Sequence, residues 1–325
     1  MGSDRMEVIR RDITANKMIK MNRLFTKLMS RNFWLKSIYR LFTYVLLMDL
    51  AFIFLFPFIH MLVTSLKTPL DVLDITVKWV PRSLYWQNYT RALKALDYGT
   101  TFINSVIITT LGTIGHVISC SFAAYGFARY RFPLRNFLFT IVLITIIIPV
   151  QVVIFPLVIQ YSNMGWLNTH LPLIVPTFFG FGLRGSLFVF IFHQFFLGLP
   201  YELEEAARID GCGAIRTYWK IVLPVAKTSV LVCTVLSMVW HWNDYFEPSI
   251  YLMKPQKLML PAKLPTLYQN LEALSKQAAS PEMEIIYNEA IVMAATFLVI
   301  LPVLIVYLIL QRKFMEGIER SGLVG

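Results

Sequence analysis

Six stretches of the sequence are long and apolar enough to cross a bilayer as helices. Each holds roughly 18 or more mainly apolar residues, the length that the hydrocarbon core requires. They cover residues 41–64, 101–127, 136–160, 171–196, 228–250 and 290–310. Backbone polar groups in hydrocarbon must be paired within one helix or in a closed barrel, and these runs lack the alternation of barrel strands. The sequence therefore predicts an all-α polytopic membrane protein with six transmembrane helices.

The overall composition excludes an ordinary soluble domain. Hydrophobic residues make up 57% of the 325 residues, and charged residues only 15%. Soluble domains hold about 45 to 50% apolar and about 25% charged residues. A net charge of +11 could indicate a protein that binds nucleic acid. The positions of the basic residues along the chain distinguish this from a membrane topology signal.

The basic residues follow the expected topology of a membrane protein. With the N-terminus in the cytosol, 20 of the 30 Lys and Arg residues fall in predicted cytosolic segments and 9 in predicted outer segments. Because cytosolic loops carry the excess of Lys and Arg, this bias predicts that both termini are cytosolic. The excess of basic residues thus reflects the membrane topology, and we expect no nucleic acid partner. We expect a basic cytosolic segment (1–40) with no cleaved signal peptide, a six-helix membrane domain (41–311) and a cytosolic tail (312–325).

The chain offers no pattern for a metal centre, a disulfide or a catalytic group. Cys120, Cys212 and Cys233 contain no Cys-x-x-Cys pair and none lies in an outer segment, which argues against both disulfide and metal. Most of the histidines are isolated, with no second ligand at metal spacing. No glycine is followed by lysine, so the phosphate-binding loop of an ATPase is absent from this sequence.

A polar loop, residues 197–227, separates the fourth and fifth predicted spans and falls on the cytosolic side. It contains Glu205-Ala206-Ala207-Arg208, then Asp210-Gly211, and ends Ile221-Val222-Leu223-Pro224. The acidic run that begins at Glu202 favours a helix N-terminus, because carboxylates stabilise the positive end of the helix dipole. We expect this helix to stop at Asp210-Gly211, and a second to run from about Ala214 to Val222 and end at Pro224.

This loop resembles the coupling loop, or EAA motif, of the permease subunits of ATP-binding cassette (ABC) importers. Nearly the whole chain after residue 40 is similar to the carbohydrate-uptake branch of that family, on the side related to the smaller permease of the maltose transporter. Further matching stretches are 64–68, 86–89, 104–105, 123–129, 148–151, 165–169, 242–245, 311–312 and Gly317. Cys212-Gly213, His241 and the end of the tail depart from the usual family pattern, which puts substrate and tail contacts in doubt.

The resemblance implies the type I importer permease fold and a multi-pass subunit of the bacterial plasma (inner) membrane. The chain itself would be no enzyme and would bind no cofactor, since ATP and Mg²⁺ belong to two partner ATPase subunits. A second homologous permease, an extracytoplasmic solute-binding protein and the lipid bilayer would be its other partners. The loop would be gripped by an ATPase through a small knob of Leu203, Ala206, Ala207 and Ile209. The expected coupling residues are Glu205, Ala206, Ala207, Arg208, Asp210, Gly211, Ile221, Leu223 and Pro224.

A second group of residues is a candidate for the substrate path. Aromatic rings beside carboxylates and amides suit sugars, and charged residues within spans usually face a cavity or a partner. The candidates are Gln151, Arg184, Trp240, Trp242, Asn243, Asp244 and Glu247. The alternative is that the aromatic residues form an interface belt, the polar residues cap a span, and the prolines beside Gln151 only kink a helix for packing. Asp49, Arg184 and Asp244 either line the path or only pack, and Arg184 has the further alternative of pairing with a partner subunit.

The predicted function is that of the pore-forming subunit of an ABC importer for a carbohydrate, either an oligosaccharide or a sugar derivative. A non-sugar solute such as glycerol-phosphate is the alternative. A self-sufficient secondary transporter would need inverted repeats or an ion-coupling site and would have no use for the EAA loop. An intramembrane enzyme would need a convergent set of nucleophile, base or metal ligands, which the sequence does not show.

Overall fold

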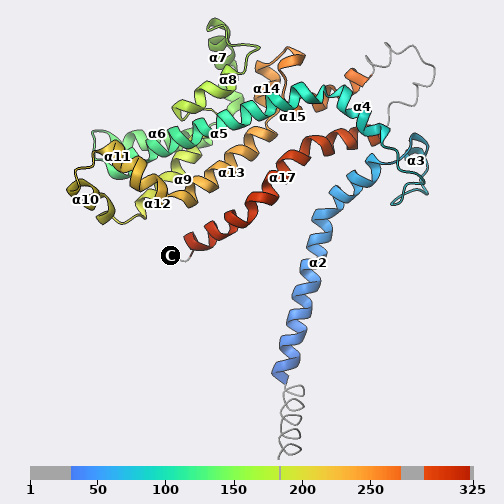
Figure 1. Ribbon diagram of the computed structural model, residues 1–325, viewed down its shortest axis with the longest axis horizontal. Coiled ribbons are helices and arrows are strands. Elements are labelled where there is room, and N and C mark those ends of the chain that lie inside the picture. The colour runs from blue at the N-terminus through green and yellow to red at the C-terminus, as the bar shows by residue number, and fades with distance from the viewer. Residues whose placement is uncertain (1–30, 183, 272–288, 323–325) are drawn as a thin grey trace, which may run out of the picture. The chain divides into compact units, whose positions relative to one another are not determined.

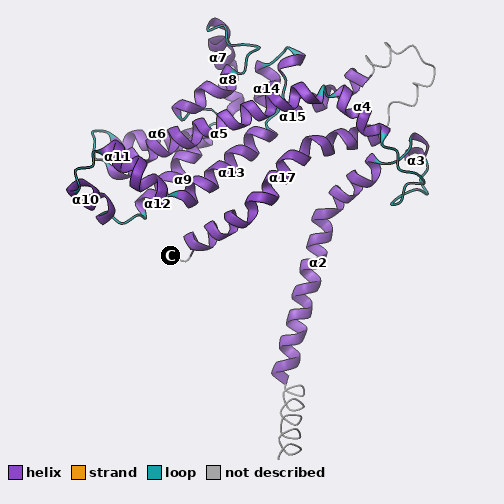
Figure 2. Cartoon of the chain, viewed as in Figure 1, coloured by secondary structure: helices purple, strands orange, loops and turns teal. Residues whose placement is uncertain are grey.

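The computed structural model describes residues 31–182, 184–271 and 289–322. Within these ranges every regular element is helical, and Figure 2 shows no strand among the described residues. The predicted all-α class is therefore confirmed for this part of the chain. Most of the predicted basic segment, residues 1–30, and the last three residues of the tail lie outside the described residues.

The helices range from single turns to more than thirty residues. In chain order they are α2 (Arg31–Ser65), α3 (Pro69–Leu73), α4 (Gln87–Ala95), α5 (Tyr98–Arg129), α6 (Arg135–Ile147), α7 (Val150–Asn163), α8 (Leu171–Ile174), η1 (Val175–Phe179), α9 (Gly185–Leu197), α10 (Glu202–Ile209), α11 (Ala214–Thr217), η2 (Tyr218–Val222), α12 (Leu223–Val225), α13 (Lys227–Asn243), α14 (Phe246–Tyr251), η3 (Pro255–Lys257), α15 (Leu260–Lys263), η4 (Leu264–Thr266) and α17 (Glu289–Gly322).

Three of these helices are long and apolar enough to cross a membrane. They are Leu35–Ser65 of α2, Tyr98–Arg129 (α5) and Glu289–Gln311 of α17. Three further helix pairs pass the same test if each bent pair counts as one span, which brings the total among the described residues to as many as six. The chain thus has membrane-spanning helices, while the count of six spans and the orientation of the termini stay predictions.

Three of the predicted spans are broken by bends or non-helical residues. The prolines of the third span predict a kinked or broken helix, and a break lies there. In the third, α6 and α7 meet at an angle of 102°, because the residue before a proline is pushed out of the helical region and Ile148 precedes Pro149 with ψ 118°. In the fourth, residues 180–184 separate η1 from α9. In the fifth, α13 ends at Asn243 and a separate short helix, α14, follows.

The chain divides into two units, Met1–His60 and Met61–Gly325. In the first unit, the described part of α2 has exposed apolar side chains around most of its circumference, and Asp49 is also exposed. A helix that is apolar all round needs lipid or other protein around it. This unit therefore has the character of a membrane span.

The second unit is built around α5, which makes its most extensive contacts with α9 and α13 (Figure 1). Small residues let these helices approach closely, as the sequence predicts for the second span. A Cβ added at Gly112 would stand 2.7 Å from the ring of His241 in α13. One core cluster packs large aromatic rings of α9 against α5, among them Phe188, Phe192 and Phe196.

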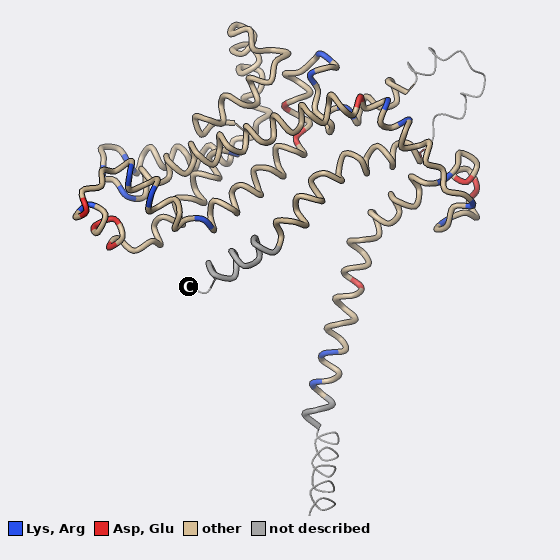
Figure 3. The backbone as a smooth tube through the Cα atoms, in the orientation of Figure 1, with Lys and Arg blue, Asp and Glu red and all other residues tan. Residues whose placement is uncertain are grey.

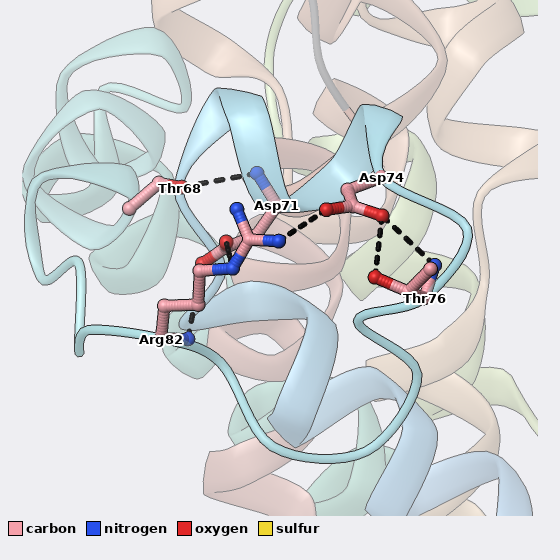
Figure 4. Close-up of polar contacts among 5 residues, drawn as sticks. All are labelled: Thr68, Asp71, Asp74, Thr76 and Arg82. Atoms are coloured by element: carbon pink, nitrogen blue, oxygen red, sulfur yellow. Dashed lines mark hydrogen bonds and ion pairs between the residues drawn. The ribbon is translucent and has the colours of Figure 1, made fainter.

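The predicted outer segment after α2 is held by a compact set of polar contacts (Figure 4). The Thr68 hydroxyl accepts a hydrogen bond from the Asp71 backbone N–H at 3.1 Å and so caps α3. The guanidinium of Arg82 closes the loop. Its Nη2 atom donates to the carboxylate of Asp74, and its Nε atom lies 3.9 Å from Asp71 Oδ1. Hydrogen bonds from the side chain and backbone of Thr76, with the charge of Arg82, lower the pKa of Asp74. The segment is therefore an ordered loop.

Candidate coupling loop and substrate path

The predicted coupling loop forms one end of the second unit, where α10, α11 and α12 lie beyond the ends of α5 and α9 (Figure 1). Figure 3 shows acidic and basic residues gathered on this end, while the long helices beside it are nearly free of charge. The loop is thus a polar helical hairpin attached to an apolar bundle. This arrangement suits a surface that meets a water-soluble partner.

The first helix of the loop ends as the sequence predicts, through a Schellman motif at Gly211. The backbone N–H of Gly211 donates to the carbonyl oxygen of Arg208 at 3.0 Å, and that of Cys212 donates to Ala207 at 2.8 Å. This pair of bonds requires a left-handed residue after the helix, a conformation that glycine adopts at little cost. Gly211 has φ +75°. The turn between the two helices is therefore fixed by one glycine.

The second helix of the loop is longer than predicted, and the expectation that Pro224 ends it is wrong. It continues through η2 and α12 to Val225. The reason is a wide, π-type turn over Tyr218–Val222, in which the Leu223 N–H bonds to the Tyr218 carbonyl. Pro224 follows within the first turn of α12, where a missing N–H is tolerated. A nearly perpendicular bend of 79° then separates this helix from α13.

The exposed face of the loop contains most of the predicted coupling residues. Glu205, Ala206, Arg208 and Asp210 are exposed, whereas Ala207 is buried and Ile221 and Leu223 are half-buried. In the knob, Ile209 is 86% exposed and Leu203 39%. Ala207 therefore packs inward and takes no part in the outer surface of the knob, which corrects its predicted place there.

Two exposed apolar residues of the second helix were not predicted. Ile215 is 64% exposed and Trp219 46%. They lie four residues apart on the second helix, the spacing that places two side chains on one helical face. This spacing in the sequence could have identified them. Large apolar residues exposed on an otherwise polar hairpin mark an interaction surface.

The candidate path residues do not form one cluster. Arg184 precedes α9 with φ 59°, and its guanidinium carbon lies 4.5 Å from the ring centroid of Trp240. Trp242 is buried in the core, where its indole N–H donates to the Val299 carbonyl at 3.0 Å. Gln151 and Asn243 are exposed at separate places in the chain. In this conformation the two tryptophans therefore have different surroundings.

Asp244 and Glu247 do come together, at a small cavity between α13, α14 and the break before α9. Its lining also includes Thr177, Gly182 and His241. The volume of about 10 Å³ is enough for about one water molecule. A sugar does not fit in a space of this size, so in this conformation the cavity is closed to such a solute. Among the described residues, no group of three or more His, Cys, Asp or Glu is placed to hold a metal ion.

Comparison with known proteins identifies the family of this chain. Residues 117–318, which include the whole hairpin, match the family of binding-protein-dependent transport system inner membrane components. The chain belongs to this family. It is accordingly a permease component of the inner membrane, and a binding protein is among the partners that the family requires.

The relatives extend this similarity over most of the chain. The sn-glycerol-3-phosphate transport system permease protein UgpE of Yersinia enterocolitica is 30% identical over 86% of this chain and 96% of its own. The probable starch degradation products transport system permease protein AmyC of Thermoanaerobacterium thermosulfurigenes is 33% identical over 83% of this chain and 91% of its own. A bacterial ABC transporter that imports the acidic polysaccharide alginate shares the fold, with a TM-score of 0.69, 24% identity and coverage of 88% and 98%.

Proposed function

We propose that this chain is one of two permease subunits of an ATP-driven carbohydrate importer. The observation that carries the proposal is the exposed hairpin α10–α12, with its turn set by Gly211 at φ +75°. Two ATPase subunits would each grip such a hairpin, one on this chain and one on a second, homologous permease. ATP and Mg²⁺ would be held by the ATPases, so that this chain acts through motion and catalyses no reaction.

The solute class is proposed from the relatives together with the resemblance of the chain. AmyC is named for starch degradation products and the structural neighbour for alginate, both of them carbohydrates. UgpE is named for sn-glycerol-3-phosphate, which keeps that solute as the alternative. Asp244 and Glu247, together with Trp240, are the side chains that we propose to meet the solute when the pathway opens. Carboxylates accept hydrogen bonds from sugar hydroxyls, whereas they repel a phosphate.

Uptake by the reconstituted importer tests this proposal. The complete complex, with its binding protein, is placed in vesicles and supplied with labelled maltodextrin. We expect uptake that requires ATP and that unlabelled maltodextrin competes away, while glycerol-3-phosphate does not. ATP-dependent uptake of labelled glycerol-3-phosphate, with none of labelled maltodextrin, would favour the alternative solute. Uptake that follows an ion gradient without ATP would contradict the importer mechanism.

A further inference from the structure

A buried ion pair joins the coupling loop to the central helix α5. Arg129, the last residue of α5, and Glu204, in the first turn of α10, lie 2.9 Å apart between Nε and Oε1. Their side chains are 0% and 5% exposed. Charged side chains are seldom buried so completely unless they are paired, because each loses its hydration. The two residues are 75 positions apart in the sequence, so the pair fixes the hairpin to a distant part of the chain.

The same guanidinium also holds the segment that leads into α10. Its Nη2 atom donates to the carbonyl oxygen of Leu199 at 2.5 Å. Its central carbon lies 4.2 Å from the ring centroid of Tyr201, within the range of a cation–π interaction. Arg129 therefore contacts α10 and its lead-in at three points. A planar group held in this way permits little rotation or sliding.

The second helix of the hairpin is tied to the same face of α5. The hydroxyl groups of Ser121 and Tyr218 are 2.7 Å apart, and the rings of Tyr125 and Tyr218 have centroids 5.3 Å apart. The Tyr125 hydroxyl in turn donates to Glu204 at 3.2 Å. Ser121, Tyr125 and Arg129 follow one another at a spacing of four, so they line one face of α5.

The side chains of this face connect α10 to α5. The contacts of α10 with other helices are chiefly with α11 and η2, which belong to the same hairpin. The most extensive contacts of α5 are with α9 and α13, the helices on either side of the hairpin in the chain. A displacement of α10 therefore reaches α5 through the side chains of this face. Packed helices linked by such contacts move as discrete rigid elements.

We propose that Arg129 and Glu204 are positioning residues that transmit the movement of the coupling loop to α5, with Ser121 and Tyr125 completing the receiving face. This inference rests on the proposed function of the hairpin. The hydrogen bonds from Arg129 to the Leu199 carbonyl and from the Tyr125 hydroxyl to Glu204 are directional and resist sliding, whereas apolar contacts are not directional. When an ATPase moves the hairpin, α5 has to follow, and α9 and α13 move with it.

The test compares the solute transported per ATP hydrolysed in the reconstituted complex. Glu204→Gln keeps the shape of the side chain but leaves the Arg129 charge buried without its partner. We expect transport per ATP to fall by about tenfold or more, because breaking a buried ion pair is strongly disruptive. Glu202→Gln is the matched control, since Glu202 is exposed in the same turn of α10. We expect this control to match the unmodified complex.

A second variant separates coupling from folding. In Arg129→Met/Glu204→Leu both charges are replaced by apolar groups, a change that often preserves stability at buried pairs. We expect folded yield and assembly with the ATPase close to normal, with transport per ATP still low. A double variant as tightly coupled as the unmodified complex would overturn the inference. An unmodified complex that shows no ATP-dependent transport would instead contradict the proposed function, so the two failures are distinguishable.

Discussion

Gly211→Ala is expected to reduce ATP-dependent solute uptake by about tenfold or more while the subunit remains inserted in the membrane. A side chain in the left-handed region costs roughly 1–2 kcal/mol, and Gly211 has φ +75°. The strain is relieved if the turn relaxes and the two Schellman hydrogen bonds to Arg208 and Ala207 lengthen. The second helix is then presented at a different angle to the ATPase. A Cβ at Gly211 meets nothing within 4 Å inside this chain, so the subunit itself has no reason to misfold.

Gly213→Ala is the matched control for this change. Gly213 lies in the same turn, and a Cβ there also meets nothing within 4 Å, but its backbone has φ −73° and ψ 163°. Any residue adopts such an extended conformation. We expect uptake close to normal for this control. Membrane insertion is followed by immunoblotting and uptake by labelled solute. Near-normal uptake by Gly211→Ala would show that the glycine turn is not needed for coupling.

Gly185→Ala is expected to lower the yield of folded protein several-fold. A Cβ at Gly185 would stand 2.3 Å from the backbone carbonyl oxygen of Gly180, a distance that real Cβ atoms do not show. The clash is with backbone, so no side-chain rotation relieves it. The turn that would have to move packs against α5, where the Cys120 thiol lies 3.4 Å from the Gly185 carbonyl oxygen. We expect a several-fold loss of monodisperse protein in detergent and a lower melting temperature.

Gly126→Ala supplies the control for that prediction. Gly126 lies inside α5 with nothing within 4 Å of an added Cβ. Alanine is favoured over glycine within a helix by about 0.5–1 kcal/mol, so this variant should be at least as stable as the unmodified chain. Size-exclusion chromatography and a thermal melt measure both variants. Equal yields and equal melting temperatures for Gly185→Ala and the unmodified chain would contradict the close packing at this turn.

The parts of the fold that the sequence predicted are those set by local chemistry. The end of α10 at Asp210-Gly211 follows from the backbone freedom of glycine, and the break at Pro149 lies where the prolines of the third span indicated a kinked or broken helix. Pro224 shows the limit of such reasoning. A proline disrupts a helix because its N–H is missing and its ring crowds the preceding turn, and here the preceding turn is the wide one at Tyr218–Val222.

The parts that the sequence could not supply depend on contacts between distant residues. Arg129 lies in a stretch that resembles the permease family, and Glu204 lies beside the EAA motif. Nothing in the chain between them indicates that the two residues pair. Trp242 shows the same limitation. Its aromatic and polar neighbours left a sugar contact and an interface belt both open, and neither reading indicated that its ring is buried against α17. Chain separation and tertiary packing, which no local pattern encodes, decided both cases.

Isolation of the complex from membranes tests the central claim most directly. The chain is tagged and purified in a mild detergent, and the chains that accompany it are identified and assayed for ATP hydrolysis. The account predicts that a second, related permease and an ATP-binding cassette subunit are recovered with it, in a complex that hydrolyses ATP. A lone chain that transports solute after purification, with no ATPase present, would contradict the account.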